Sequence, residues 1–325
     1  MKYVGSKARI SRHILPIIQG AIDRNGIETY VEPFVGGGNL IDKVHCHNRI
    51  GYDNNEYLIG FWQALQTGWN PGTVPMSKEL YTQIKDYKEL FRPEVVALAG
   101  FCATYNAKWF GGYAGTVKTK TGEIRNYYDE AVRNVLKQIP ALADVVFQVK
   151  SYEEISPSGC LVYCDPPYEG TTKYIGSFNH SHYWEWVRKM SENNIVICSE
   201  YAAPDDFICI WEMERTTTLD KASRTKAIER LFVRRGSGGV FAIYIIRLRP
   251  RYGLEYRGKE KSKCYMLICH SLRAERFRKS LIVRLHGLLT ICKIQTRHSE
   301  KSGKSQSIFP SFRMKCATTR RSKFL

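Results

Sequence analysis

The sequence predicts an α/β protein with a mostly parallel sheet and helices on both faces. Three observations support this class: apolar runs of strand length recur along the chain, segments with helical spacing separate them, and a glycine-rich turn follows the first run. The longest apolar run, over residues 239–246, is far shorter than the ~18 residues that cross a bilayer. No membrane partner is therefore expected. A hydrophobic content of 43% predicts a sizeable core.

The N-terminal part of the chain is predicted to form a helix followed by a βαβ unit. The expected elements are a helix over residues 10–22, a strand at 30–31, a glycine turn within 32–38, a helix from Asn39 and a strand over 49–52. Pro16 has no backbone N–H, so it must sit in the first turns of its helix or kink it. Strand, glycine turn, helix and strand in this order form a βαβ unit, whose second strand ends at Asp53.

Residues 61–150 are predicted to form a mostly helical insertion. Apolar residues at helical spacing occur over 78–104 and again over 128–139. Between them, residues 106–115 are rich in aromatic rings and glycine, and residues 116–125 are polar and basic. We expect this stretch to form one aromatic and basic loop or hairpin on the insertion.

The alternating pattern returns after the insertion. The expected elements are a strand over 160–164, a helix over 183–190 and strands at 195–198, 207–211 and 231–233. Continuous apolar runs indicate strands that are buried on both faces, as in parallel sheets covered by helices. The sheet should be complete at Val233, so residues 1–60 and 151–233 are expected to form one domain.

The net charge of +18 is unevenly distributed along the chain. Residues 1–233 hold 26 Lys and Arg against 27 Asp and Glu, whereas residues 234–325 hold 23 against four and contain no Asp. Two interpretations of this basic tail stay open: a nucleic-acid-binding arm, or a segment not shaped by selection for this fold, such as a disordered or frameshifted end. The missing Asp and the abrupt change at Arg234 favour the second. A family-like continuation in another reading frame of the encoding DNA would confirm it.

Three features mark a candidate site at the carboxyl ends of the predicted strands. The glycines at 36–38 let a ligand approach the backbone, although their spacing is not that of a dinucleotide-binding turn and a tight structural connection is an equal alternative. Asp53 is placed to bind the two hydroxyls of a ribose. The alternative is that Asp53 is an exposed acid in a loop with no ligand. The sharpest feature is Asp165-Pro166-Pro167-Tyr168, for which a generic turn is the less favoured alternative. Its two prolines must end the preceding strand, which directs an aspartate and an aromatic ring out of the sheet edge.

Four short motifs follow one another along residues 1–233, and their order as well as their residues are informative. They are Lys2-Tyr3-Val4-Gly5-Ser6-Lys7, Val31-Glu32-Pro33-Phe34-Val35-Gly36-Gly37-Gly38, Asp53-Asn54-Asn55 and Val162-Tyr163-Cys164-Asp165-Pro166-Pro167-Tyr168. Together they resemble the Dam-type DNA adenine-N6 methyltransferases. The resemblance implies a Rossmann-like methyltransferase sheet, a target-recognition insertion over 61–150 and S-adenosylmethionine as methyl donor. It also implies a cofactor pocket lined by Tyr3, Lys7, Glu32, Pro33, Phe34, Gly36, Gly38, Asp53 and Asp165.

The resemblance further implies that Asp165, Pro166 and Tyr168 act in catalysis, and the chemistry asks for these residue types. The N6 of adenine is a poor nucleophile because the ring delocalises its lone pair. The Asp165 carboxylate and the Pro166 carbonyl can accept both N6 hydrogens and direct the lone pair at the methyl group, with no covalent intermediate. Tyr168 is placed to stack on an adenine flipped out of the duplex.

Two other functions stay open at this point. Methylation of cytosine N4 uses the same amine chemistry, although a serine in place of Asp165 would have favoured it. The other is a nucleic-acid-binding protein with an inactive methyltransferase body, against which the intact Glu32, Asp53 and Asp165 count. A cytosine-C5 enzyme would need a cysteine nucleophile, typically after proline, and none of the ten cysteines follows a proline.

Double-stranded DNA is the expected partner, and a nearly neutral body must bind it through local basic patches. The first candidate patch lies in the insertion and comprises Lys108, Trp109, Phe110, Tyr113, Lys118, Lys120 and Arg125. The second comprises Lys221, Arg224, Lys226 and Arg230, with a solvated charged face as an equal alternative. No metal site is predicted, since the Cys and His spacings of the tail form no short-range ligand pairs.

The start of the sequence lacks the apolar stretch of a signal peptide, so we expect a cytoplasmic protein of a bacterium or a phage-infected host cell. In that compartment the ten cysteines should be thiols. The recognition sequence, a cognate restriction endonuclease and RNA as an alternative substrate stay open.

Overall fold

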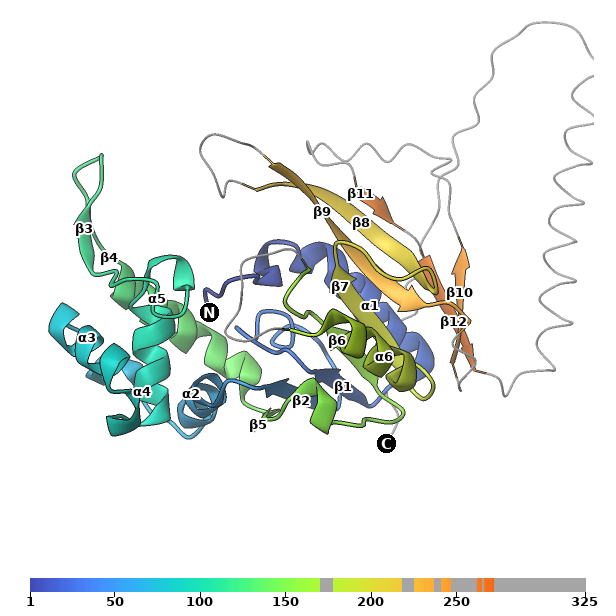
Figure 1. The fold of residues 1–325 in the computed structure, drawn as a ribbon, viewed down its shortest axis with the longest axis horizontal. Helices are drawn as coiled ribbons and strands as arrows, with labels where there is room; N and C mark the ends of the chain where they lie inside the picture. The colour runs from blue at the N-terminus through green and yellow to red at the C-terminus, as the bar shows by residue number, and fades with distance from the viewer. Residues whose placement is uncertain (170–177, 218–224, 237–240, 247–261, 265, 272–325) are drawn as a thin grey trace, which may run out of the picture. The chain divides into compact units, whose positions relative to one another are not determined.

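The computed structural model of the chain describes residues 1–169, 178–217, 225–236, 241–246, 262–264 and 266–271 (Figure 1). Internal contacts divide the chain into two units, Met1–Leu272 and Arg273–Leu325, and the second lies outside the described residues. None of the described helices combines the length and the apolar character needed to cross a membrane.

The described residues contain a central sheet with the strand order β11-β8-β9-β7-β6-β1-β2-β5. The strands are β1 Thr29–Glu32, β2 Asn48–Asp53, β5 Val145–Val149, β6 Leu161–Cys164, β7 Ile195–Glu200, β8 Phe207–Thr217, β9 Thr225–Arg234 and β11 Ser262–Cys264. The run from β7 to β5 is parallel, whereas β9 is antiparallel to both β7 and β8, and β11 is antiparallel to β8. Two smaller antiparallel pairs are β3 (Thr116–Lys118) with β4 (Ile124–Asn126), and β10 (Phe241–Ile246) with β12 (Met266–Ser271).

The sheet is covered by helices on both faces, as the sequence predicts. The α-helices are α1 Ser11–Asn25, α2 Glu56–Gln66, α3 Lys78–Asp86, α4 Pro93–Ala97, α5 Tyr127–Gln138 and α6 His180–Met190. Alternate strand residues point to opposite faces. Tyr30 and Leu161 therefore belong to the cluster that packs against α1, α2 and α4, whereas their neighbours Val31 and Val162 pack with α6. This two-sided burial explains the continuous apolar runs of β6 and of the first four residues of β7.

The strand order reverses direction at one point in the parallel part of the sheet. From β1 the chain builds outward through β2 to β5, and it then returns to the other side of β1 to add β6 and β7. In open α/β sheets, ligands bind beyond the carboxyl ends of the strands at such a reversal. The segments that follow β1 and β6 are residues 33–38 and 165–168, so the fold brings the glycine turn and the Asp-Pro-Pro-Tyr segment to this position.

The predicted helix after the glycine turn is wrong, because residues 39–43 form hydrogen-bonded turns, with the Asp42 N–H donating to the Gly38 carbonyl at 3.4 Å and the Lys43 N–H to the Leu40 carbonyl at 2.9 Å. Side chains take the carbonyl groups that a helix would have used for its own hydrogen bonds. The Asn39 carbonyl accepts from Lys43 Nζ at 2.8 Å, and the Ile41 carbonyl accepts from Arg49 at 2.7 Å. The carbonyls of residues 37 and 38 accept from a buried glutamine of α5. Consequently the glycine turn is not followed by a helix N-terminus with free N–H groups.

Residues 61–150 contain the predicted helices and hairpin. α3, α4 and α5 account for most of the helical residues, and a π-helical turn over Leu98–Cys102 extends α4. β3 and β4 form the predicted basic hairpin, which leads directly into α5 through its N-cap residue Asn126. At the two ends of this range, α2 packs on the central sheet and β5 joins it as the strand beyond β2. β5 was not predicted as a strand, although four of its five residues, Val145, Val146, Phe147 and Val149, are β-branched or aromatic.

The sheet also extends beyond the predicted last strand. β9 ends at Arg234, and β11 then pairs with β8, so the sheet is not complete at Val233 as predicted. β10 and β12 likewise belong to the basic tail. The remainder of the tail, including the cysteines and histidines beyond residue 271, lies outside the described residues.

Candidate active site

A buried lysine and a carboxylate meet at the carboxyl end of β6. Asp165 follows the last residue of this strand, and Lys7 reaches it from the single helical turn Lys7–Arg9, which Ser6 caps. Lys7 Nζ lies 2.9 Å from Asp165 Oδ1 and 3.6 Å from Glu229 Oε2 in β9. Lys7 is only 6% exposed, whereas Asp165 keeps 20% of its side-chain surface. The aspartate therefore remains reachable while its counter-ion is enclosed.

Tyr168 is anchored to the same group of residues. Its hydroxyl donates to Glu229 Oε2 at 3.0 Å and lies 2.5 Å from Ser199 Oγ at the end of β7. The Lys7 ammonium lies 4.3 Å from the centroid of the Tyr168 ring, and the Tyr201 ring meets it edge-on at 4.6 Å. Tyr168 is 8% exposed, so the ring is held in place by contacts on several sides.

The environment moves the pKa values of both partners of the ion pair. Burial raises the pKa of Asp165 to about 6, although Lys7 opposes the shift, and Glu229 adds to it. Burial acts to lower the pKa of Lys7, but the carboxylates of Asp165 and Glu229 outweigh it, so the pKa of Lys7 is raised. At neutral pH the pair is therefore ionised, with Asp165 close to the point at which it takes up a proton.

Glu32 ends β1 on the other side of the strand reversal. It is 4% exposed, and the hydroxyl of Tyr30 donates to its Oε1 at 2.8 Å. Burial raises the pKa of Glu32 to about 8, so this carboxyl group is mostly protonated at neutral pH. A neutral carboxyl can donate a hydrogen bond as well as accept one, which suits it to a polar ligand group.

The glycine turn is tied to the end of β2. The N–H of Gly36 donates to Asp53 Oδ2 at 3.1 Å, and the N–H of Asn55 donates to Oδ1 at 3.0 Å. Burial raises the pKa of Asp53 to about 6 against the effect of these two N–H donors. Asp53 is thus a structured acid at the carboxyl end of its strand, not an exposed loop acid.

The turn itself needs glycine because of its backbone angles and its neighbours. Gly36 and Gly38 have φ of 48° and 61°, in the left-handed region that glycine favours. A Cβ on Gly36 would also lie 2.8 Å from the Tyr3 ring, and the carbonyl of Gly36 accepts from Trp62 Nε1 at 3.1 Å. The predicted pocket residue Tyr3 therefore packs directly on the turn.

Four acids with raised pKa values line one edge of the sheet. Glu32, Asp53, Asp165 and Glu200 stand at or just beyond the carboxyl ends of β1, β2, β6 and β7. Burial raises the pKa of Glu200 to about 7, in line with the other three. Acids with raised pKa values at a strand reversal make this edge the candidate functional site.

Comparison with known proteins identifies the family of the chain. The model of the D12 class N6 adenine-specific DNA methyltransferases matches residues 3–186, more than half of the chain. The chain belongs to this family. It is 24% identical over 210 residues to the type II methyltransferase M.FokI of Planomicrobium okeanokoites, a match that covers 58% of this chain and 31% of that protein. Among solved structures it is similar to the rRNA methyltransferase AviRa from Streptomyces viridochromogenes, with 12% identity, a TM-score of 0.32 and coverage of 71% and 85% of the two chains.

Membership of the D12 class confirms the family predicted from the four sequence segments. The fold brings most of the predicted pocket residues to one edge: Tyr3, Lys7, Glu32, Gly36, Gly38, Asp53 and Asp165. Phe34 instead faces the α6 side, where its ring lies within 6.0 Å of the rings of Tyr152, Phe178 and Tyr183. Pro33 is buried between Glu32 and Phe34.

The predicted DNA-binding residues of this D12-class chain fall into three groups. Trp109, Phe110 and Tyr113 pack within the insertion: the Trp109 ring lies 4.6 Å from Phe101, and Tyr113 donates to the Met76 carbonyl at 2.9 Å. In contrast, Lys108, Lys118 and Lys120 are exposed, the last two on or beside the β3–β4 hairpin. Arg125 forms two hydrogen bonds with the Glu130 carboxylate, at 2.8 and 2.7 Å. The exposed lysines are thus the part of the patch that is open to a partner.

The second predicted basic cluster is mostly outside the part of the chain that the structure describes. Lys221 and Arg224 lie outside it, and only the backbone of Lys226 is described. Arg230 is engaged within the sheet, since its guanidinium pairs with Glu212 at 3.5 Å and donates to the Tyr201 carbonyl.

Sequence reasoning missed three members of the site: Ser199, Glu200 and Glu229. Ser199 and Glu200 directly follow the predicted strand 195–198, so the rule that selected Asp165 after its strand would have found them as well. Glu229 lies in an antiparallel strand and meets Lys7 through tertiary packing. No local pattern marks it.

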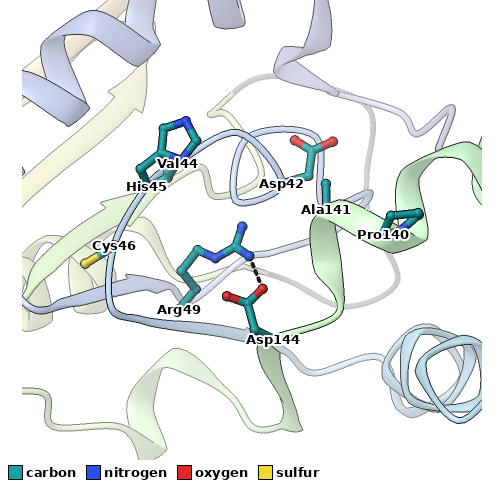
Figure 2. Close-up of a pocket in the computed structure, with 8 residues that line it drawn as sticks. All are labelled: Asp42, Val44, His45, Cys46, Arg49, Pro140, Ala141 and Asp144. Atoms are coloured by element: carbon teal, nitrogen blue, oxygen red, sulfur yellow. Dashed lines mark hydrogen bonds and ion pairs between the residues drawn. The ribbon is translucent and has the colours of Figure 1, made fainter.

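A cavity of about 340 Å³ has none of the four acids among its lining residues. Figure 2 shows the residues that line it. It is lined by the loop between β1 and β2 and by the segment before β5: Asp42, Val44, His45, Cys46, Arg49, Pro140, Ala141 and Asp144. The buried Arg49 is already paired with Asp144 and bound to the Ile41 carbonyl, so its charge is satisfied within the protein. Because Arg49 and Asp144 stand at the starts of β2 and β5, this cavity lies toward the edge opposite the candidate site.

Replacing Glu32 with glutamine is expected to stabilise the protein at alkaline pH. The pKa of Glu32 is raised from 4.5 to about 8 in the folded state, so its favourable contribution is complete below pH 4.5 and is lost as the pH rises through 8. E32Q stays neutral and still accepts from Tyr30. The gain in unfolding free energy should be near zero at pH 4 and approach about 5 kcal/mol at pH 9. Denaturant unfolding across this pH range measures it.

The exposed Glu185→Gln should show no such trend, and a pH-independent difference for E32Q would contradict the burial of a neutral carboxyl.

Proposed function

We propose that the protein transfers a methyl group from S-adenosylmethionine to the N6 atom of an adenine in double-stranded DNA. The observation that supports this most strongly is the partly exposed Asp165 at the strand reversal, held by the enclosed Lys7 and followed by Tyr168, in a chain of the D12 class. The chain spans about a third of the length of the curated relative it matches. Activity, substrate and partners are therefore proposals for this chain.

The residues around the glycine turn suit a nucleoside with an attached amino acid. Asp53 offers a carboxylate at the end of β2, where an acid can accept hydrogen bonds from ribose hydroxyls. The backbone at Gly36 and Gly38 takes left-handed angles, and Glu32 and Tyr3 stand beside it. S-adenosylmethionine bound here would supply an electrophilic methyl group on its sulfonium.

Asp165 would position and activate the amine of the target base. Its carboxylate and the Pro166 carbonyl accept the two N6 hydrogens, which aligns the nitrogen lone pair with the methyl group and favours the positive charge that develops on nitrogen. The methylated nitrogen must then release one proton. Asp165, whose pKa burial raises to about 6, is suited to accept it. No covalent bond between enzyme and base is needed.

Tyr168 would hold the flipped adenine by stacking. The Lys7 ammonium lies 4.3 Å from the centroid of the ring, and we propose that the base stacks beside this cation. The hydrogen bonds from Tyr168 to Glu229 and Ser199 support this role, because they fix the ring plane before the base arrives. A preorganised ring costs less entropy on binding than a mobile one.

We propose that the insertion, residues 61–150, contacts the DNA and that Lys108, Lys118 and Lys120 bind its phosphates. Residues 1–60 and 151–233 would then form the catalytic domain. The type II designation of M.FokI supports a restriction-modification setting with a cognate endonuclease. The cytoplasm of a bacterium or of a phage-infected cell is the compartment where such a partner and the DNA would meet.

Methylation of a random-sequence DNA pool tests the proposed function. The full chain is incubated with the pool and S-adenosylmethionine labelled in its methyl group, and the digested nucleosides are identified by mass spectrometry. The expected product is N6-methyladenine, confined to one sequence context when modified positions are mapped. Label in N4-methylcytosine would assign the alternative chemistry. Cofactor binding without any labelled nucleoside would indicate an inactive methyltransferase body.

A further inference from the structure

One glutamine of the insertion holds the glycine turn. Gln138, the last residue of α5, is 8% exposed, and its Nε2 donates to the carbonyls of Gly37 at 3.2 Å and Gly38 at 2.9 Å. The same nitrogen lies 3.0 Å from Asp42 Oδ2, and Gln138 Oε1 accepts from the amino group of Met1. The side-chain amide is therefore fully occupied, and two of its contacts go to the backbone of the turn.

Side chains supply donors to three carbonyls of the turn. Residues 39–43 form turns rather than a helix, and the Asp42 N–H donates to the Gly38 carbonyl at 3.4 Å. The Gly36 carbonyl accepts from Trp62, and the carbonyls of Gly37 and Gly38 accept from Gln138. Buried carbonyls without donors are costly, so removing Gln138 would push the turn toward a conformation that solvent can reach.

Gln138 is also joined to the hairpin by one continuous helix. α5 starts at Tyr127, directly after Asn126 ends β4, and its 12 residues span ~18 Å. The hairpin at the start of this helix presents Lys118, and Gln138 stands at its other end. The element that we expect to face DNA thus continues into the residue that fixes the turn.

We propose that Gln138 is a positioning residue for the methyl donor: it sets the conformation of the glycine turn from within the target-recognition insertion. The inference rests on the proposed function, in which this turn holds S-adenosylmethionine. Gln138 acts through the carbonyls of Gly37 and Gly38 and takes no part in the methyl transfer itself. Its loss should therefore weaken donor binding and leave the chemical step intact.

Two variants of the full-length chain test the proposal. Gln138→Met keeps the size of the side chain and removes its donors, and Gln138→Glu keeps the shape but turns a carboxylate toward two carbonyls and Asp42. Titration calorimetry with S-adenosylmethionine gives the donor Kd, and steady-state kinetics gives KM for donor and for DNA. We expect Kd and donor KM to rise about tenfold in Q138M and further in Q138E. The value of kcat and the KM for DNA should stay within about twofold of wild type.

Gln66 provides the matched control. It is another partly buried glutamine, and its Nε2 donates to the carbonyls of Leu142 at 2.6 Å and Val145 at 2.8 Å instead of to carbonyls of the turn. Gln66→Met loses the same kind of contact and should leave the donor Kd unchanged. An effect in Q66M equal to that in Q138M would overturn the proposal, because general loosening would then explain both.

The outcomes separate the inference from the proposed function. If both Gln138 variants bind S-adenosylmethionine with wild-type affinity while the wild type methylates DNA, the inference is overturned and the proposed function is retained. If the wild type itself binds no S-adenosylmethionine, both fail. If Q138E does not fold, Q138M alone tests the proposal. Recovery of the full kcat of Q138M at saturating S-adenosylmethionine would support a positioning role and would count against general structural damage.

Discussion

Replacing Asp165 with asparagine should lower kcat by about a thousandfold while S-adenosylmethionine still binds. The asparagine amide has one acceptor atom and no negative charge, so it can neither hold the amine as the carboxylate does nor favour the charge that develops on nitrogen. Asp165 also pairs with the enclosed Lys7, but Lys7 keeps Glu229 as a second partner, which should allow the variant to fold. Single-turnover methylation and calorimetric titration measure the two properties separately.

The control for this variant is an aspartate with a similar ion pair outside the site. Asp206 binds Arg188 at 2.7 Å and is 41% exposed. Asp206→Asn removes a charge-assisted pair without touching the four acids, and its rate should match that of the wild type. If D165N retained more than about a tenth of the wild-type rate, Asp165 would not be the acceptor for the target amine.

Replacing Lys7 with methionine should have the second large effect, on both stability and the pH profile. The variant leaves the carboxylates of Asp165 and Glu229 facing each other without the cation that now lies between them. Loss of one partner from a buried ionic group costs roughly 3–5 kcal/mol of unfolding free energy. Denaturant unfolding at pH 7.5 measures this cost.

The direction of the pH effect follows from the pKa of Asp165. Activity needs the ionised carboxylate, so the wild-type rate should fall as the pH drops through about 6. Because Lys7 lowers the pKa of Asp165 and Glu229 raises it, K7M should move this acid limb to higher pH and recover part of its rate under alkaline conditions. The stability difference from wild type should shrink in acid, where Asp165 takes up a proton in the folded state.

Lys2 is the matched control for Lys7, because it lies in the same N-terminal segment and is exposed. Lys2→Met should leave the unfolding free energy and the acid limb unchanged. An acid limb in K7M at the wild-type position would show that Lys7 does not influence Asp165 and would remove the electrostatic basis of the site.

Local sequence determined the fold class and the centre of the site. The apolar runs at 160–164 and 195–198 predict strands because a parallel strand is buried on both faces, and each is a strand in the structure. Asp165 could be placed at the sheet edge for a similar reason: Pro166 and Pro167 lack the N–H groups that a continuing strand requires. Backbone chemistry within a few residues was sufficient for both predictions.

Partners that are remote in sequence were decided by the tertiary structure. Glu229 reaches Lys7 and Tyr168, and Gln138 reaches Gly37 across 101 positions of the chain. The expected helix after Gly38 failed for the same reason, because side chains from α5 and β2 take the carbonyls that local spacing assigned to a helix.

The charge of the chain shows the same division. The sequence established that the +18 belongs to residues 234–325 and that the body is nearly neutral. Burial at the strand reversal decides which acids of that body have raised pKa values. These acids stand at the ends of four different strands: Glu32, Asp53, Asp165 and Glu200. Local sequence determines backbone conformation and the charge of a residue, whereas desolvation and long-range hydrogen bonds exist only after distant segments have packed together.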